Sequence, residues 1–414
     1  MIKVEKNRLR ALNGLIVGVG VFLVLFAGHY PQYQLSPLAY KIMPMFKLTT
    51  SQFSAVFTAA SIAPILLAIV SGTLADRFGV KIVVGIGVII AAIGTCMRVF
   101  ADNYGTLFFT MILSGCGFAV MFSNFSKFIG TWFKRENIGK IIGICMLGTT
   151  LSMTVASATT AYFPSMKSAY ITAAVVSVFT VLFWFLFVQN KPADAPAAPP
   201  AQPIIKYLGV VFKSKAVWVT GICVMGVFGS DMTLSAFLPV ALKTVRGINP
   251  GLAGIMTAMF FISNLCGVVL GPVLFQKIGR TRLFMIVMGL LTAFGMAFAW
   301  LAPQGVPMGA ALFVTGFSMG SLIPVLLSFP MLIPEIGPVY AGSAGGLIVT
   351  LEQLGSFFIP TYIIAPIAGS NYHIIMYLAG VCMIFMCLVA FFLPELLTKS
   401  KLNFQAEKVT SQRG

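Results

Sequence analysis

Long apolar runs recur along almost the whole chain, and they constrain its fold more than any other feature. Each run has about twenty residues or more, enough for a helix to cross a hydrocarbon layer of roughly 30 Å. Because backbone N–H and C=O groups meet no water at that depth, each run must pair them internally as a helix. Twelve runs qualify, so we expect an all-α membrane protein with twelve transmembrane helices.

The runs fall into two sets of six, separated by a Pro/Ala-rich segment. The first set is expected at about 11–42, 51–75, 81–101, 104–133, 138–163 and 167–188. The second set is expected at about 216–244, 250–275, 283–302, 307–331, 341–367 and 372–394. Residues 190–203, NKPADAPAAPPAQP, cannot form a spanning helix and predict an extended linker. The predicted domains are therefore a six-helix bundle over 1–189, a cytoplasmic linker over 190–206, a second bundle over 207–397 and a tail over 398–414.

A weak internal sequence repeat relates the two halves at a spacing of 200 residues. The segment GTLADRFGVK (72–81) matches PVLFQKIGRTR (272–282), with Gly279 on Gly79 and Gln276 on Asp76. The register extends upstream, where FKLTTSQF (46–53) matches RGINPGLA (246–253). Internal repeats of this kind predict two pseudo-symmetric six-helix bundles.

The net charge of +17 is distributed as in membrane proteins rather than nucleic-acid-binding proteins. If residues 1–10 are cytoplasmic, twenty of the 27 Lys and Arg fall in cytoplasmic segments and five in external ones. The other two, Arg98 and Lys127, lie in or near helices. This bias predicts a multi-pass protein of the cytoplasmic (inner) membrane, with both termini cytoplasmic, the bilayer as a partner and no nucleic acid.

Several functional classes lack their motifs. The seven Cys all lie in apolar runs, and the two His have no Cys, Asp or Glu at metal-ligand spacing. There is no Gly-rich phosphate loop of the Walker type and no nucleophile–base arrangement. We therefore expect no cofactor, no metal and no enzymatic activity.

The pattern Gly72-x-x-x-Asp76-Arg77-x-Gly79-x-Lys81 resembles the signature loop between helices two and three of the major facilitator superfamily, although Ile82 replaces its usual second basic residue. The resemblance implies a monomeric secondary transporter that works by alternating access. It also implies that the glycine lets helices two and eleven approach and that the acid caps helix eleven. Because Gln276 replaces the acid in the second loop, only one of the two latches is expected to be charged. The implied conformational-switch residues are Gly72, Asp76, Arg77, Gly79, Lys81, Lys277 and Gly279.

Two other family patterns are missing. Met111 occupies the position where proton-coupled members often carry an arginine. The fifth helix reads GICMLGTTLSM (143–153) and lacks the glycine–proline motif that drug/proton antiporters share. The second absence disfavours a drug exporter of that class.

Polar side chains at membrane depth are the candidate site residues, because a charge there costs about 2.5–3.5 kcal/mol on insertion scales. On the first helix, His29 and Tyr33 form one stripe and Tyr30 and Gln34 an adjacent one. We expect them to contact substrate; interhelical hydrogen bonds and aromatic packing are the alternative. They lie in a segment interrupted by Pro31, where the helix is expected to bend.

The remaining candidates are two acids and a polar face on the fourth helix. The repeat places Asp231 opposite Pro31, with Ser235 on the same helix face. Glu352 and Gln353 lie about a dozen residues into the eleventh helix. We expect Asp231 and Glu352 to couple protons or contact substrate; the alternative is a structural role, neutral or paired with a basic group.

Asn124 and Lys127 on the fourth helix are further candidates for substrate contact, although Lys127 can also snorkel to the interface. For Arg98 we expect snorkelling or a pair with Asp102 rather than a ligand.

These features predict uptake of a small organic acid or zwitterion, such as an amino acid, by proton symport. The alternative is proton-coupled efflux of amphipathic cations, which two buried acids and many aromatics would suit. A channel or receptor-like protein is a third possibility, and the duplicated halves disfavour it.

Overall fold

The computed structural model describes residues 2–133, 137–191, 204–333 and 335–395, and within them every regular element is a helix. Twelve helices in these ranges are long and apolar enough to cross a membrane. Their spans include Leu12–Met45 at one end of the chain and Tyr372–Ala390 at the other. The predicted fold class, an all-α membrane protein with twelve spanning helices, is confirmed.

The chain divides into two compact units. Unit 1 comprises Met1–Gln202 with Ser235–Ala258, and unit 2 comprises Pro203–Leu234 with Met259–Gly414. The helices α9 (Lys215–Thr244) and α10 (Pro250–Ile278) therefore contribute to both units. Most of the predicted linker and all of the predicted tail lie outside the described residues.

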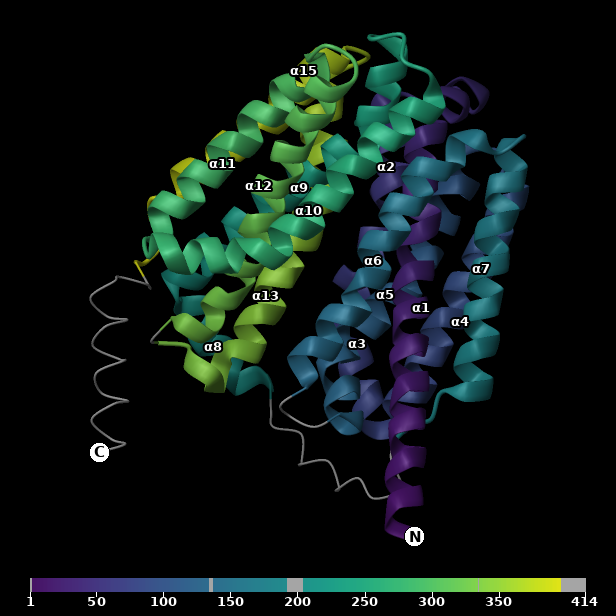
Figure 1. The fold of residues 1–414 in the computed structure, drawn as a ribbon, viewed down its shortest axis with the longest axis vertical. Coiled ribbons are helices and arrows are strands. Elements are labelled where there is room, and N and C mark those ends of the chain that lie inside the picture. The colour runs from purple at the N-terminus through teal and green to yellow at the C-terminus, as the bar shows by residue number, and fades with distance from the viewer. Residues whose placement is uncertain (1, 134–136, 192–203, 334, 396–414) are drawn as a thin grey trace. The chain divides into compact units, whose positions relative to one another are not determined.

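In unit 1, α1 runs beside α4–α7, and the chain colours of Figure 1 show these helices in purple to teal. The helices are α1 (Ile2–Met45), α2 (Thr50–Thr58), α3 (Ile62–Phe78), α4 (Val80–Met97), α5 (Tyr104–Trp132), α6 (Ile138–Thr159) and α7 (Met166–Phe187). Three short 3-10 turns extend them: η1 (Ala59–Ser61), η2 (Arg98–Phe100) and η3 (Thr160–Tyr162).

In unit 2, α11 packs on α12 and α15, and α12 packs on α13. The short helix α8 also contacts α13. Besides α9 and α10, the helices are α8 (Ile204–Lys213), α11 (Thr281–Phe298), α12 (Val306–Leu332), α13 (Gly337–Phe358), α14 (Ala365–Ala368) and α15 (Tyr372–Ala390), joined by the 3-10 turn η4 (Ala299–Leu301) and the π-helical segment η5 (Ile359–Ile364).

Several helix ends differ from the predicted ones. The first helix extends from residue 2 to residue 45, beyond the expected 11–42, because the Lys, Glu, Arg and Leu residues before it are good helix formers. The predicted second helix is interrupted by η1, where α5 approaches it closely. A Cβ atom at Gly115 of α5 would collide with the backbone of Ala60. The glycine therefore allows this contact.

The 200-residue repeat is visible in local geometry. The turn after α1 has Lys47 at φ +50°, and the turn after α9 has Gly247 at φ +65°. Two residues after Lys47 and Gly247, a side chain accepts a hydrogen bond from the backbone. The Thr49 hydroxyl accepts from the Gln52 N–H at 3.2 Å, and the Asn249 side chain accepts from the Gly251 N–H at 2.9 Å. Both residues thus cap the following helix.

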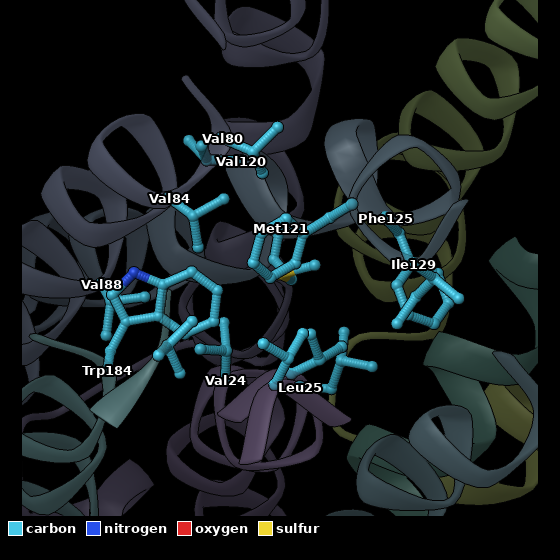
Figure 2. Close-up of a cluster of buried hydrophobic side chains, with 14 of the residues drawn as sticks. Val24, Leu25, Val80, Val84, Val88, Val120, Met121, Phe125, Ile129 and Trp184 are labelled. Carbon is cyan, nitrogen blue, oxygen red and sulfur yellow. The ribbon is translucent and has the colours of Figure 1, made fainter. Parts of the chain in front are cut away.

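The core of unit 1 is made largely of β-branched residues that interdigitate between α1, α4, α5 and α7. Figure 2 shows valines of α1 and α4 converging on Met121 and the indole ring of Trp184. Trp184 is fully buried, and its Nε1 donates to the Lys81 backbone oxygen at 2.9 Å. This bond satisfies the polar atom of an otherwise apolar core. It also ties α7 to the start of α4.

Candidate functional site

The first candidate stripe lies on α1 in unit 1. His29 Nδ1 is 3.2 Å from the Leu25 carbonyl oxygen, one turn earlier. The imidazole ring packs edge-on against Phe118 of α5, with ring centroids 4.3 Å apart. A Cβ atom at Gly28 would lie only 2.8 Å from the Phe118 Cβ. The glycine therefore lets α5 approach α1, so that His29 is half-buried against Phe118.

The two candidate tyrosines of α1 are buried among aromatic rings. Tyr30 stacks on Phe26 at 5.4 Å between centroids. Tyr33 is fully buried and meets Phe57 edge-on at 5.5 Å. Edge-on and offset pairs at such distances are favourable. Aromatic packing, the alternative to substrate contact, thus describes much of the environment of these two rings.

Arg98 is a buried charged residue whose environment the sequence did not predict. It is 0% exposed and does not snorkel. Its guanidinium donates to the Pro31 carbonyl at 2.5 Å and to Gln34 Oε1 at 2.7 Å, and it lies over the Tyr170 ring at 4.2 Å. The expected pair with Asp102 is therefore wrong, because Nη1 and Nη2 bond to α1 and the guanidinium lies over a ring of α7, while Nε has no hydrogen-bond partner among the described residues.

Gln34 belongs to the same buried network. Its Nε2 donates to the Ala169 carbonyl of α7 at 2.9 Å, while its Oε1 accepts from Arg98. Both ends of the amide are thus bonded inside unit 1. Arg98 and Gln34 together fix the segment of α1 that carries His29, Tyr30 and Tyr33.

The polar residues of α5 do not share an environment. Asn124 is buried, and its Nδ2 donates to the Val120 carbonyl at 2.9 Å and reaches the Ser71 carbonyl of α3 at 3.5 Å. Lys127, one turn later, is exposed. Asn124 therefore holds α3 against α5, whereas Lys127 is accessible.

The two acids lie in unit 2 and are both buried. Asp231 of α9 is 9% exposed, and its Oδ1 has no hydrogen-bond partner among the described residues. Glu352 of α13 is 7% exposed and accepts from Gln353 Nε2 at 3.0 Å. An incompletely satisfied buried carboxylate is costly, so Asp231 is the candidate whose position packing explains least.

The packing of α9 on α13 fixes how far apart the two acids lie along the helix axes. A Cβ atom at Gly221 would meet Leu351, one at Gly229 would meet Ile359, and one at Gly355 would meet the Met225 carbonyl. In each pair the residue of α13 or η5 lies 130 positions after its partner on α9. The two helices therefore run in the same direction. Asp231 is thus level with η5, and Glu352 lies nine residues, or roughly 14 Å, nearer the other end.

The π-helical segment η5, which lies at the same level along the helix axes as Asp231, has an unusual backbone. It contains Pro360, which cannot donate the hydrogen bond that an α-helix requires. Wider turns of this kind occur often at functional sites. The sequence signal for it, a proline inside the eleventh apolar run, was available.

Ser235 lies on α9 one turn after Asp231, but its surroundings belong to unit 1. Its backbone oxygen accepts from the Ser36 hydroxyl of α1 at 2.5 Å, and the same hydroxyl reaches the Ala236 oxygen at 3.0 Å. Phe237 meets Phe53 of α2 with centroids 5.9 Å apart. Ser235 therefore takes part in the contact of α9 with α1 and α2.

In the first loop, the side chain of Asp76 lies outside the description. Within unit 1, no described atom lies within 4 Å of the position that a Cβ would take at Gly72. Arg77 is exposed over Phe78, 5.2 Å from the ring centroid.

Gly79 has φ +86° and donates to the Ala75 carbonyl at 3.0 Å. The N–H of Lys81, at the start of α4, donates to Asn190 Oδ1 at 3.1 Å. The helix is therefore capped by a residue outside the loop.

The second loop repeats this backbone but has a carboxylate that sequence reasoning missed. Gly279 has φ +65° and donates to the Phe275 carbonyl at 2.9 Å, and Lys277 beside it is exposed. Glu395 accepts from the Thr281 N–H at 2.8 Å and from the Arg282 N–H at 3.2 Å. A negative charge at a helix N-terminus is favourable.

Within the described residues, no three His, Cys, Asp or Glu side chains are grouped to hold a metal ion. The polar groups instead line helices of a repeated membrane fold. These features define a polytopic membrane transporter built from two related six-helix halves.

The chain belongs to the Major Facilitator Superfamily, whose family model matches residues 11–360. It is thus a secondary transporter, as the resemblance of the first loop implied.

Relatives over most of the chain include a probable nitrate/nitrite antiporter of Thermus thermophilus, 24% identical and covering 86% of each chain. A probable sulfoacetate transporter of Cupriavidus necator is 24% identical over 88% of this chain and 93% of that protein. A hexuronate transporter of Bacillus subtilis is 22% identical, and here the match covers 61% of this chain and 62% of the relative, less than two thirds of its length.

Solved structures share the fold. A bacterial homolog of the human lysosomal transporter Spinster, inward-facing and occupied, gives a TM-score of 0.74 at 14% identity, covering 91% of this chain and 95% of that one. A mutant of the nucleoside transporter NupG gives 0.73 at 14% identity, covering 91% and 99%.

Proposed function

We propose that this transporter takes up a small organic anion or a zwitterion by alternating access, coupled to the symport of protons. The observation that carries the proposal is the buried Asp231, whose Oδ1 lacks a hydrogen-bond partner among the described residues. The substrates for which these relatives are named support the substrate class, because hexuronate, nitrate, nitrite and sulfoacetate are all anions. We further propose a monomer in the inner membrane with both termini cytoplasmic.

We assign direct substrate contact to His29, Tyr30 and Tyr33 of α1 and to Lys127 of α5. A lysine and tyrosine hydroxyls suit a carboxylate or another oxyanion. The remaining site residues are Gln34, Asn124, Ser235, Glu352 and Gln353. Gln34, Asn124 and Ser235 make protein contacts that hold α1, α3 and α9, so we assign them to the positioning of the site.

We assign proton coupling to both acids, and each acid has a different role. Asp231 lies at the level of η5, and Glu352 lies roughly 14 Å away along the axis of α13. A single proton cannot be shared directly over that distance. Asp231 is therefore the proposed coupling site, and Glu352, held by Gln353, is a second site that a proton or a substrate ammonium group can occupy.

The test is uptake of labelled glucuronate, sulfoacetate and nitrate into proteoliposomes with and without an inward proton gradient. Asp231→Asn is expected to abolish accumulation driven by the gradient while substrate exchange continues, because exchange needs no net proton movement. Glu335→Gln is the matched control, since Glu335 is exposed outside the spans. Uptake and pH dependence that are unchanged in Asp231→Asn would refute the coupling role.

The alternative function is proton-coupled efflux of amphipathic cations, which two buried acids also favour. A thermal-shift screen separates the two, because a ligand that binds only the folded state raises the unfolding temperature. Carboxylates should stabilise the protein under the first proposal and lipophilic amines under the second. Counterflow in liposomes tests both against a channel, which shows no accelerated exchange.

A further inference from the structure

Two connections of unit 1 carry a concentration of basic residues on the side opposite the N-terminus. The end of α1 and the turn after it bring Lys41 and Lys47, and the end of α9 and the turn after it bring Lys243 and Arg246. We call these four residues the basic patch. Neither 41–50 nor 243–250 contains an Asp or Glu. Transporters usually keep their basic residues on the cytoplasmic side, so this patch requires its own explanation.

The structure holds the two connections together. Lys243 Nζ lies 3.8 Å from the centroid of the Tyr40 ring, and Lys41 Nζ lies 5.6 Å from the same centroid. One turn earlier on α1, Ser36 bonds to the α9 backbone. The positive charges of two segments 200 residues apart therefore share one surface.

Lys47 is kept in an unfavourable backbone conformation. Among the described residues it is the one non-glycine residue with positive φ, at +50°. The equivalent turn of the second half uses Gly247 at φ +65°. In the first turn the Leu48 N–H donates to the Met43 carbonyl five residues earlier, and in the second the Ile248 N–H donates to the Leu242 carbonyl six residues earlier. A lysine there costs roughly 1 kcal/mol relative to glycine. Because a glycine forms the equivalent turn, the local structure does not require the Lys47 side chain. Backbone strain of this kind concentrates at functional positions.

We propose that the basic patch attracts the anionic substrate to the surface of unit 1 on the side opposite the N-terminus. The inference rests on the proposed function, because it takes the substrate to be a small carboxylate or oxyanion. Clustered charges of one sign raise the local concentration of the opposite ion by about 10-fold or more. Salt screens the effect, with a Debye length of about 8 Å at 0.15 M.

The local potential can be measured without knowing the substrate. Met45 is 67% exposed between Lys41 and Lys47, and Met45→Cys places a thiol in the patch. The rates of labelling by sulfonatoethyl and trimethylammonioethyl methanethiosulfonate give an anion-to-cation ratio, after subtraction of labelling of the seven native cysteines in the parent protein. In neutral detergent at low salt, Lys47→Gly is expected to lower this ratio about threefold, and about 0.5 M salt should remove the difference.

A matched control removes the same charge from the same side of the membrane. Lys167, the second residue of α7, lies over the Phe100 ring, 5.9 Å from its centroid, and is outside the patch. Lys167→Gln should leave the ratio unchanged. An unchanged ratio in Lys47→Gly, or an equal fall in Lys167→Gln, overturns the proposal. Lys47→Gly should also raise the unfolding temperature, so a low ratio cannot be attributed to misfolding.

The anions attracted could belong to lipid headgroups instead of a soluble substrate. The labelling ratio is therefore measured again in phosphatidylcholine nanodiscs with and without phosphatidylglycerol. A ratio that is kept in both supports capture of a soluble anion. A ratio that disappears only with phosphatidylglycerol shows that lipid headgroups occupy the patch, and it overturns the assignment.

Uptake then links the patch to transport. For whichever of glucuronate, sulfoacetate and nitrate is taken up, Lys47→Gly should raise the apparent KM about twofold or more at low ionic strength without changing the maximal rate. If the wild-type protein takes up none of them while the labelling ratio behaves as expected, the proposed function fails and the anion-attracting patch stands. If uptake occurs with a KM that neither salt nor Lys47→Gly alters, the patch plays no part in capture.

Discussion

The loop that joins α3 to α4 and the loop that joins α10 to α11 have the same backbone but different capping chemistry. In each, a glycine with positive φ ends one helix and donates to the carbonyl four residues earlier. In unit 1 the next helix is capped by the neutral amide of Asn190, and in unit 2 by the carboxylate of Glu395. Both capping residues follow the last helix of their own half.

The comparison shows that the repeat preserved a turn while the charges moved to other segments. The resemblance implies that only the first of the two latches is charged, because Gln276 stands where the repeat has Asp76. In the structure the second loop gains its carboxylate from Glu395, 114 positions after Thr281, and Arg282 Nε donates back to the Leu393 carbonyl at 2.9 Å. A carboxylate therefore caps the next helix in unit 2 despite the missing loop acid.

The 3-10 turns that follow α4 and α11 differ in a similar way. In η2, Arg98 is buried and bonds to α1. In η4 the buried residue is Trp300, whose Nε1 donates to the Ala297 carbonyl at 3.1 Å and whose ring packs on His373 at 4.9 Å. The first half thus fixes this turn with a charge and the second with an aromatic ring.

The largest expected effect comes from removing the buried charge. Arg98→Met leaves the Pro31 carbonyl and Gln34 Oε1 without their donor, and each orphaned buried acceptor costs about 1–3 kcal/mol. We expect a loss of about 3 kcal/mol in the free energy of unfolding, measured in detergent with a dye that reacts with the free cysteines as they become exposed. Trp300→Phe, the matched change in the second half, should cost about 1 kcal/mol. Equal losses would mean that the two turns are equivalent.

How much of this could be predicted from the sequence depends on the range of each contact. Run length predicted twelve helices and the repeat paired the two loops, because those signals are local. Arg98 was assigned to Asp102, four residues away, whereas its partners Gln34 and Pro31 lie 64 and 67 positions away. Glu395 and Asn190 act over more than 100 positions. Nothing local in the sequence specifies such pairs, and the candidate substrate residues still await a test.

The second expected effect concerns the glycine of the first loop. A Cβ atom at Gly79 would collide with the Asn190 side chain, and the positive φ adds roughly 1–2 kcal/mol of strain for a non-glycine residue. Gly79→Ala should therefore lose about 2 kcal/mol of unfolding free energy, and Gly279→Ala about 1 kcal/mol from the backbone conformation. Adding Asn190→Ala to Gly79→Ala should restore part of the loss. If the second change adds its own full cost instead, the contact with Asn190 contributes nothing.

The smallest expected effect separates the two capping chemistries. Glu395→Gln keeps one acceptor but loses the charge that faces two N–H groups at the start of α11. A charge-assisted bond contributes about 1.5–3 kcal/mol, and at a half-exposed position we expect a loss of about 1.5 kcal/mol at low salt. The loss should shrink as salt screens the wild-type charge, when unfolding is followed between about 0.05 and 0.5 M NaCl.

The reciprocal change, Asn190→Asp, gives unit 1 the chemistry of unit 2 at constant side-chain size. A carboxylate at the N-terminus of α4 should favour the helix by about 0.5 kcal/mol at low salt, since the macrodipole is positive there. Lys81, whose Nζ already donates to the Phe185 carbonyl at 3.3 Å, adds a positive charge nearby. If Asn190→Asp destabilises the protein, or if Glu395→Gln costs the same at every salt concentration, the two loops are not interchangeable versions of one joint. The difference between Asn190 and Glu395 would then be a requirement of each half and not a drift from a common ancestor.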